Sequence, residues 1–259
     1  MNFSNLNSIA NYIVENGKGI LAADESNPTC KKRFDTISVE STEENRRDYR
    51  QLLFQAEGMS NNIGGVILFD ETIRQNTVDG TALVDLIKQK EALPGIKVDK
   101  GLAPFENSDI EKVTQGIEDL DTRCAEYYKM GALFTKWRAV ISIGKTLPSQ
   151  GCIEENAKLL ARYAKIVQKN NMVPIVEPEV LMDGSHSVEE CYDATSRTLK
   201  SLFQNLEEEN VDITGTILKP NMITPGSEHQ EKISVETVAK ETLRCLHECV
   251  PENLPAITF

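Results

Sequence analysis

Residues 173–179 read Val-Pro-Ile-Val-Glu-Pro-Glu, with an apolar first half and two carboxylates near the end. A strand of a parallel sheet that is covered on both faces normally reads as a continuous apolar run. Side chains two residues apart point to the same face of a strand, so Glu177 and Glu179 should lie together. The stretch therefore predicts a buried parallel strand that carries two acids at its C-terminal end.

Six further runs along the chain have the character of short buried strands. Helical periodicity follows each predicted strand except the last one. From the second strand onward, the strand starts are roughly 30 to 42 residues apart, which suits a repeated strand, loop, helix and loop. Repeated units of this kind imply parallel strands with right-handed crossovers. The six runs are residues 19–23, 65–69, 95–98, 132–134, 214–218 and 255–259.

The helices between these strands are indicated by apolar residues at steps of three and four. Ser41-Thr42-Glu43-Glu44 is a capping-box pattern that opens one helix. A second helix is predicted over residues 110–127, with Gly131 as its stop signal. Two more are predicted over residues 192–206 and 235–246. The residues expected on the buried face of the first helix are Tyr49, Leu52, Leu53 and Ala56.

Seven parallel strands can form a doubly wound sheet or most of a (β/α)8 barrel. A dinucleotide-binding sheet would carry a G-x-G-x-x-G motif after its first strand, and none follows residues 19–23. No linker or change of composition divides the chain, so we expect a single domain over residues 1–259. The prediction is an α/β fold, a TIM (β/α)8 barrel truncated after the seventh strand. The C-terminal strand and tail are expected to be absent, so either the chain is a fragment or another segment covers the open edge.

The composition is that of an ordinary globular protein. Hydrophobic residues make up 40% of the 259 residues, and 28 basic against 40 acidic side chains give a net charge of −12. Such an anion has no electrostatic reason to bind nucleic acid or an acidic membrane surface. No stretch is long and apolar enough to span a bilayer, and the N-terminus does not read as a secretory signal. We therefore expect a cytoplasmic protein that binds neither nucleic acid nor membranes.

The cysteines do not point to a disulfide framework or a metal site. All six are scattered without C-x-x-C pairs, which in a chain of this length favours reduced thiols. Cys245, His247 and Cys249 are closely spaced, but they fall on a predicted helix and lack a fourth ligand. No metal site is predicted.

Charge also interrupts the ends of other predicted strands. In a (β/α)8 barrel these C-terminal ends converge on one mouth, where catalytic groups lie. A solvated residue at the start of a loop would explain any one of the charges, but a ring of them is better explained by an active site. The charged ends are Asp24-Glu25, Asp70-Glu71, Lys97-Val98-Asp99-Lys100, Lys136-Trp137-Arg138, Glu177-Pro178-Glu179 and Lys219.

The residue types at this mouth favour lysine chemistry. The three histidines, His186, His229 and His247, fall outside the strand ends, so a histidine-based triad has no support. A lysine can attack a ketone and form an iminium, which serves as an electron sink. The attack requires a neutral amine; a lysine pKa is ordinarily about 10.4, and burial or a second cation lowers it. Lys219 follows an apolar run and would face Lys136, so it is the best candidate for the nucleophile.

Six motifs occur in a consistent order along the chain, and together they resemble the class I (Schiff-base) fructose-bisphosphate aldolase family. The motifs are GKGILAADES over residues 17–26, TEENRR over 42–47, GIKVDKG over 95–101, KWR over 136–138, VPIVEPE over 173–179 and LKPNMITPG over 218–226.

The resemblance implies a metal-independent glycolytic lyase without a cofactor. It would cleave fructose 1,6-bisphosphate reversibly to dihydroxyacetone phosphate and glyceraldehyde 3-phosphate. Lys219 is implied to form the iminium, Glu177 to help expel water, and Asp24 to take the proton of the C4 hydroxyl. Lys136 is implied to be the cation beside the nucleophile, with Glu179 a further catalytic member of the ring. The residues implied to bind substrate or line the path of its phosphates are Lys97, Arg138, Arg46, Arg33 and Ser26.

Purely structural roles are also open for single positions. Glu179 and Lys136 could form only a buried ion pair, and Arg46 could be only a cation on a helix face. The resemblance further implies a sugar phosphate substrate, a homotetramer and a possible cytoskeletal partner.

The chain also departs from the family's pattern. Asn27-Pro28-Thr29-Cys30 replaces a small Thr-Gly-Ser-like segment, and proline should restrict this loop. The family's Ser-Gly-Gly strand end, its phosphate-binding arginine on an eighth strand and its tail ending in tyrosine are missing, so weak or no cleavage by this chain alone is expected. The alternative function is a non-catalytic, truncated aldolase-like fragment or isoform that acts by subunit or cytoskeletal association. A zinc-dependent aldolase is disfavoured because no histidine ligand set is present.

Overall fold

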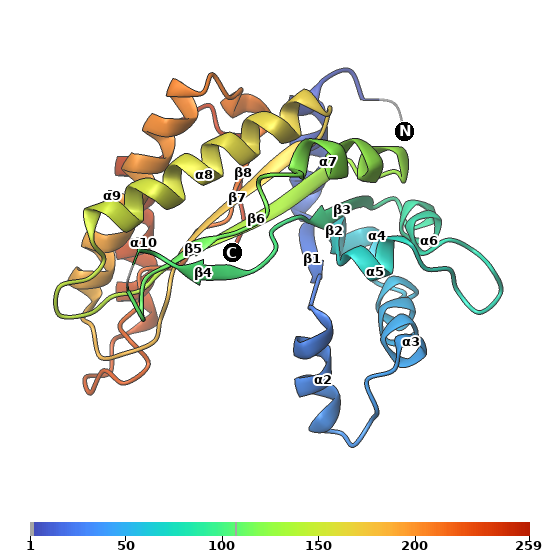
Figure 1. The fold of residues 1–259 in the computed structure, drawn as a ribbon, viewed down its shortest axis with the longest axis horizontal. Coiled ribbons are helices and arrows are strands. Elements are labelled where there is room, and N and C mark those ends of the chain that lie inside the picture. The colour runs from blue at the N-terminus through green and yellow to red at the C-terminus, as the bar shows by residue number, and fades with distance from the viewer. Residues whose placement is uncertain (1–2, 107) are drawn as a thin grey trace.

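A curled parallel sheet forms the centre of the molecule, and the computed structural model describes it within residues 3–106 and 108–259 (Figure 1). The sheet has seven strands in the order β1-β2-β3-β6-β7-β8-β9, and every neighbouring pair is parallel. This confirms the predicted α/β barrel architecture and its seven strands. The strands are β1 (Gly19–Ala23), β2 (Ile63–Leu68), β3 (Leu93–Lys97), β6 (Phe134–Ile141), β7 (Val173–Val180), β8 (Ile217–Leu218) and β9 (Ala256–Ile257).

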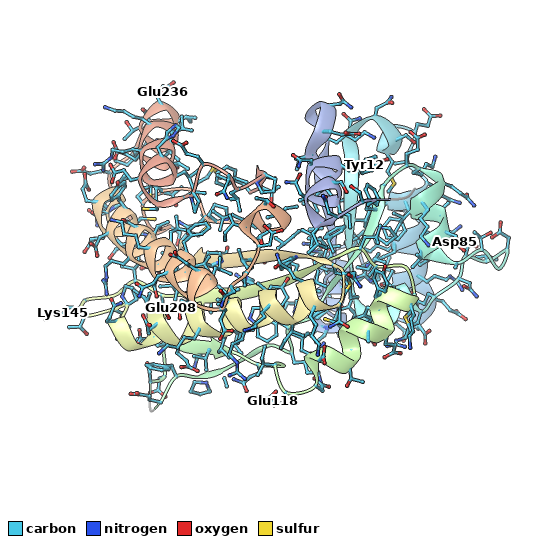
Figure 2. The ribbon with its side chains drawn as sticks, turned by 90° about the horizontal axis from the view of Figure 1, so that it is seen from above. Tyr12, Asp85, Glu118, Lys145, Glu208 and Glu236 are labelled. Atoms are coloured by element: carbon cyan, nitrogen blue, oxygen red, sulfur yellow. The ribbon has the colours of Figure 1, made fainter. Side chains whose placement is uncertain are left out.

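Helices cover the outside of the sheet, and α8 and α9 lie side by side along part of it (Figure 1). Charged side chains such as Asp85, Lys145, Glu208 and Glu236 project from the periphery (Figure 2). In the described residues, no helix is both long and apolar enough to cross a membrane. The helices are α1 (Leu6–Val14), α2 (Asn27–Asp35), α3 (Glu43–Phe54), α4 (Met59–Asn62), α5 (Asp70–Ile73), α6 (Leu83–Gln89), α7 (Leu120–Lys129), α8 (Gln150–Lys169), α9 (Val188–Glu208) and α10 (Val235–Cys249), with short 3-10 turns at Glu15–Gly17 and Ile213–Gly215.

The two faces of the sheet bury different sets of residues. The outward face, with Trp137, Val176 and Leu218, packs against helices in the larger core cluster. The inward face is apolar near the N-terminal ends of the strands, where α1 packs against it through Ile9, Ala10 and Ile13. The strand residues of this inner cluster are Ile67, Leu93, Phe134, Val173, Ile175, Ile217 and Ala256.

The inward face changes character along each strand. Since side chains alternate with a period of two, Phe134 is followed on the same face by Lys136 and Arg138, and Ile175 by Glu177 and Glu179. The same strands therefore build an apolar base and a charged mouth.

The helix predicted after the capping pattern forms as α3, but of its predicted apolar face only Tyr49 and Leu53 are partly buried. Thr42 caps the helix, because its Oγ1 accepts a hydrogen bond from the N–H of Asn45 at 3.1 Å. The buried residues are Arg46, Arg50 and Phe54, whereas Leu52 is 71% exposed. Polar partners at the ends of β1 and β2 select this face, and local periodicity contains no information about them.

The helix predicted over residues 110–127 is also wrong in its first half. Residues Lys112–Thr114 form β5, which pairs antiparallel with β4 (Leu102–Pro104). The Thr114 hydroxyl donates to the carbonyl oxygen of Arg138 at 2.7 Å, and Gly116 has a φ of +114° that ends the extended segment. The helix, α7, begins only at Leu120, and Gly131 follows its end as predicted.

The Pro28 segment, which the sequence suggests is a stiffened loop, is instead the start of α2. Pro28 lies in the first turn, where its missing N–H has no intrahelical partner to lose.

Candidate active site

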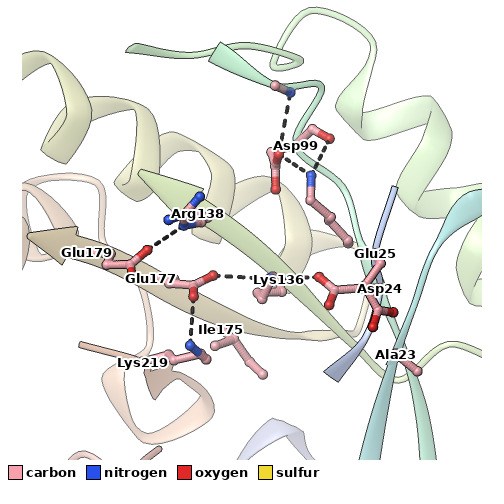
Figure 3. Close-up of polar contacts among 12 residues, drawn as sticks. Ala23, Asp24, Glu25, Asp99, Lys136, Arg138, Ile175, Glu177, Glu179 and Lys219 are labelled. Atoms are coloured by element: carbon pink, nitrogen blue, oxygen red, sulfur yellow. Dashed lines mark hydrogen bonds and ion pairs between the residues drawn. The ribbon is translucent and has the colours of Figure 1, made fainter. Parts of the chain in front are cut away.

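The C-terminal ends of four strands bring four charged residues together at the mouth (Figure 3). Asp24 directly follows β1, Lys136 lies in β6, Glu177 lies in β7 and Lys219 directly follows β8. The backbone N–H of Lys219 donates to the carbonyl oxygen of Val176 at 2.9 Å, which anchors this residue beside β7.

These four side chains form a continuous row of alternating charge. The Nζ of Lys219 donates to Glu177 Oε1 at 2.7 Å. The other carboxylate oxygen, Glu177 Oε2, lies 3.3 Å from Lys136 Nζ, an ion pair without the alignment of a hydrogen bond. Lys136 Nζ in turn lies 2.7 Å from Asp24 Oδ2. The predicted meeting of Lys219, Lys136, Glu177 and Asp24 in one site is therefore confirmed as geometry.

Lys136 is a fixed cation in this row. Burial would lower the pKa of its ammonium, but the carboxylates of Asp24 and Glu177 outweigh burial and raise the pKa above the ordinary lysine value. Glu177 is thus placed between a permanently charged amine and the amine of Lys219.

A cavity of about 890 Å³ opens above the row, within the size range of small-molecule sites. Two ion pairs lie in its wall: Lys97 contacts Asp99, and Arg138 Nε donates to Glu179 Oε2 at 2.5 Å. Lys219 borders a neighbouring cavity of about 390 Å³ and meets the larger one through Glu177. The predicted site residues that line the larger cavity are Asp24, Ser26, Lys97, Lys136, Arg138, Glu177 and Glu179.

Arg46 does not line this cavity. Its Nε and Nη2 donate to the two oxygens of Glu71 at 2.8 and 2.6 Å, and its Nη1 donates to the carbonyl oxygen of Ser41 at 2.6 Å. The hydrogen bonds from Arg46 hold the pKa of the Glu71 carboxyl below its usual value. The geometry therefore favours a brace between α3 and α5 over a contact with substrate phosphate.

Arg33 also lies outside the residues that line the cavity. Its Nη1 donates to Glu25 Oε1 at 2.5 Å, and its side chain is 59% exposed. It lies on α2, close to the mouth but directed at Glu25.

Asp99, which the sequence places in the ring of charged strand ends, holds Lys97. Two further residues near the mouth are missing from the residues predicted for the site. Asn221 accepts from the N–H of Val180 at 3.1 Å and donates to Thr195 Oγ1 at 3.0 Å, which ties the end of β7 to the segment after Lys219. Arg50 is fully buried beside β1. Arg46, Arg50 and Phe54 lie four residues apart and so share one face of α3, but this spacing alone does not predict that a face with two arginines is buried.

The cysteines and histidines do not form a metal site in the part of the chain that the structure describes. Cys245 and Cys249 are buried in α10, while His247 is exposed. All six cysteines are buried and unpaired with one another.

Comparison with known proteins gives a consistent result. Residues 5–259 match the family described as "Glycolytic: Fructose-bisphosphate aldolase class-I". The chain is similar to a "Probable fructose-bisphosphate aldolase class 1" of Xanthomonas campestris pv. campestris, with 50% identity over 259 residues that cover 100% of this chain and 78% of the relative. It is also 50% identical to "Fructose-bisphosphate aldolase 4, cytosolic" of Arabidopsis thaliana, over 96% of this chain and 64% of the relative.

A solved structure agrees with these sequence relatives. It is a ternary co-crystal structure of fructose-bisphosphate aldolase from Plasmodium falciparum in complex with TRAP and a small-molecule inhibitor. It superimposes with a TM-score of 0.96 at 48% identity, covering 97% of this chain and 73% of the other.

Proposed function

The chain belongs to the class I fructose-bisphosphate aldolase family of glycolytic lyases, and from this premise we propose that Lys219 is the nucleophile of its reaction. The hydrogen bond of 2.7 Å between Lys219 Nζ and Glu177 Oε1 carries the proposal. The family supports the aldolase function over a non-catalytic role in association. The reaction is the reversible cleavage of fructose 1,6-bisphosphate into dihydroxyacetone phosphate and glyceraldehyde 3-phosphate.

Iminium formation is proposed to depend on Lys219 and Glu177. Lys219 passes a proton to the carboxylate of Glu177, and the resulting neutral amine attacks the C2 carbonyl of the open-chain sugar and forms a carbinolamine. Glu177 gives a proton to the departing hydroxyl, water leaves, and the iminium remains. The short distance between the two side chains supports this proton transfer, because an acid catalyst must lie within hydrogen-bond reach.

Carbon–carbon cleavage is proposed to depend on Asp24. Its carboxylate takes the proton of the C4 hydroxyl, the C3–C4 bond breaks, and the electron pair moves into the iminium. Glyceraldehyde 3-phosphate leaves and an enamine remains. Protonation at C3 and addition of water then release dihydroxyacetone phosphate and restore Lys219. Lys136, charged and in contact with both carboxylates, holds the two acids in their places.

The cations in the cavity wall are proposed to bind a substrate phosphate. Arg138 offers a planar fork suited to phosphate, and Lys97 offers a point charge. Both face acids, Glu179 and Asp99, so an entering phosphate competes with an existing ion pair. Ser26 adds a hydroxyl at the same cavity.

Five wider properties are part of the same proposal. We propose a single-domain, cytoplasmic protein, in keeping with the printed names of the Arabidopsis relatives as cytosolic. We propose a homo-oligomer, tetrameric as implied by the family, and a mechanism without a metal or cofactor. The Plasmodium aldolase in complex with TRAP supports the proposal of a protein partner, and the cytoskeleton is the one we expect.

Borohydride reduction in the presence of dihydroxyacetone phosphate tests the nucleophile. We expect a stable adduct on the peptide that contains Lys219, and no adduct in Lys219→Met. Lys100→Met is the matched control, because Lys100 lines the larger cavity but pairs with Asp119 away from the row. An adduct on Lys136, or none on the folded wild type, would overturn the proposal.

A further inference from the structure

Arg50, on the inner face of α3, has an exposed fraction of 0%. It lies beyond the residues that line the cavity, so it cannot touch the substrate directly. Its contacts nevertheless converge on the residue proposed to drive carbon–carbon cleavage.

The guanidinium of Arg50 bridges the two carbonyl oxygens on either side of Asp24. Its Nε donates to the carbonyl oxygen of Ala23 at 3.1 Å, and its Nη2 donates to that of Glu25 at 2.6 Å. Ala23, Asp24 and Glu25 leave the end of β1 together (Figure 3). The planar fork therefore fixes the backbone from which the Asp24 side chain projects toward Lys136.

The side chain of Glu25 also contacts this fork. Its Oε2 lies 3.4 Å from Arg50 Nη2. Its Oε1 accepts from Arg33 Nη1 at 2.5 Å and from the hydroxyl of Tyr49 at 3.2 Å. Four side chains thus immobilise three backbone positions at the end of β1.

Stability alone does not account for an arginine at this position. Its third nitrogen, Nη1, has no partner among the residues that the structure describes. A buried polar group without a partner destabilises the fold, and buried ion pairs are often no more stabilising than apolar replacements. The free energy of folding therefore does not explain the guanidinium, whereas its effect on the position of Asp24 does.

We propose that Arg50 is a positioning residue for the cleavage step, acting through the backbone of Asp24. The inference rests on the proposed function, because it assigns Arg50 to the Asp24 step and not to the Lys219 step. Loss of the fork should displace the Asp24 carboxylate, and a misplacement of about 1 Å can lower a rate by about 100-fold.

Two variants test the role. Arg50→Lys keeps the charge but replaces the planar fork of two nitrogens by a single ammonium nitrogen, and Arg50→Gln removes the charge and serves if the lysine variant does not fold. Borohydride trapping with dihydroxyacetone phosphate reports iminium formation, and aldehyde release from the bisphosphate reports cleavage. We expect trapping within about 2-fold of wild type and cleavage lowered by about 10- to 100-fold.

A destabilised fold is separated from a displaced carboxylate by a control and a double mutant. Phe54→Leu, one turn further along the same buried face, lowers stability but removes no hydrogen bond to residues 23–25, and should keep the ratio of cleavage to trapping. In an Asp24→Asn background, Arg50→Gln should lower cleavage by less than about 2-fold, because both changes act through one group.

Equal losses of trapping and cleavage in the Arg50 variants would overturn the inference, as would a full additional loss in the Asp24→Asn background. A wild type that forms no adduct on Lys219 is a different result: it overturns the proposed function, and with it the step to which Arg50 is assigned.

Discussion

Lys136 Nζ and Asp24 Oδ2 lie 2.7 Å apart although their strands are not neighbours in the sheet. β2 and β3 separate β1 from β6, and three strand spacings in a flat sheet amount to about 14 Å. The two side chains meet only because the sheet curls toward them. The ion pair thus forms as a result of the curvature that brings the site together.

Lys136→Met should lower the free energy of unfolding substantially. The change leaves the carboxylates of Asp24 and Glu177 buried without their shared cation, and breaking a buried pair in this way costs about 3–5 kcal/mol. Urea denaturation measures the loss. Lys100→Met, at a half-exposed ion pair with Asp119, should change stability by less than about 1 kcal/mol. Similar losses in both variants would contradict the buried row.

The stabilisation by Lys136 should disappear at high pH. Because the folded-state pKa of Lys136 is raised above the ordinary 10.5, its contribution is complete below about pH 10.5 and is lost as the pH rises through the folded value. The difference in unfolding free energy between wild type and Lys136→Met should therefore shrink above pH 10.5 and stay constant from pH 7 to 9. A constant difference throughout would show that the charge of Lys136 is not what stabilises the fold.

The pair of Arg46 and Glu71 should have the opposite pH dependence. The pKa of Glu71 lies below its ordinary 4.5, so its contribution is present above pH 4.5 and is lost as the pH falls through the folded value. Glu71→Gln should cost about 2 kcal/mol at pH 7 and progressively less in acid, as followed by urea denaturation. Asp35→Asn, at an exposed pair with Lys31, is the control and should have little effect at either pH.

Gly64→Ala should be among the most damaging small substitutions in the sheet. A Cβ at Gly64 in β2 would lie 1.9 Å from the carbonyl oxygen of Ile13 in α1, and backbone cannot rotate away as a side chain can. We expect a loss of about 3 kcal/mol, the upper end for overpacking. Gly19→Ala in β1 meets nothing within 4 Å and should be nearly neutral in the same thermal or urea measurement.

Arg138→Ala should weaken binding through substrate phosphate in particular. We expect KM for the bisphosphate to rise by about 10-fold or more, since a charged hydrogen bond contributes roughly 1.5–3 kcal/mol. An unphosphorylated ketose should be affected far less in the same steady-state assay. An equal rise for both sugars would argue that Arg138 acts on the reacting carbons.

The row of four charged residues was predictable because it follows from local rules. Alternation within a strand places Lys136 with Arg138 and Glu177 with Glu179, and parallel pairing aligns the C-terminal ends of neighbouring strands. The apolar runs before Asp24 and Lys219 marked the two remaining members. None of these inferences needs knowledge of a distant contact.

The residues that escaped prediction depend on distant contacts. Arg46 turns to Glu71 and not to the cavity, and this partner lies 25 residues further along the chain. In the same way, β5 forms because β4 and the carbonyl oxygen of Arg138 offer it hydrogen-bond partners. The buried face of α3 follows the same logic: arginines replace leucine on the inside because strand ends offer them acceptors.

The apolar base under the charged mouth affects the strength of the interactions between the charged side chains. Ile175 and Ile217 are hydrocarbon directly beneath Glu177 and Lys219, and α1 seals that layer from below. Charges next to such a layer of low dielectric constant attract and repel one another more strongly than the same charges in water. A polar residue introduced at Ile175 or Ile217 would therefore weaken the attraction and repulsion among the charges above it.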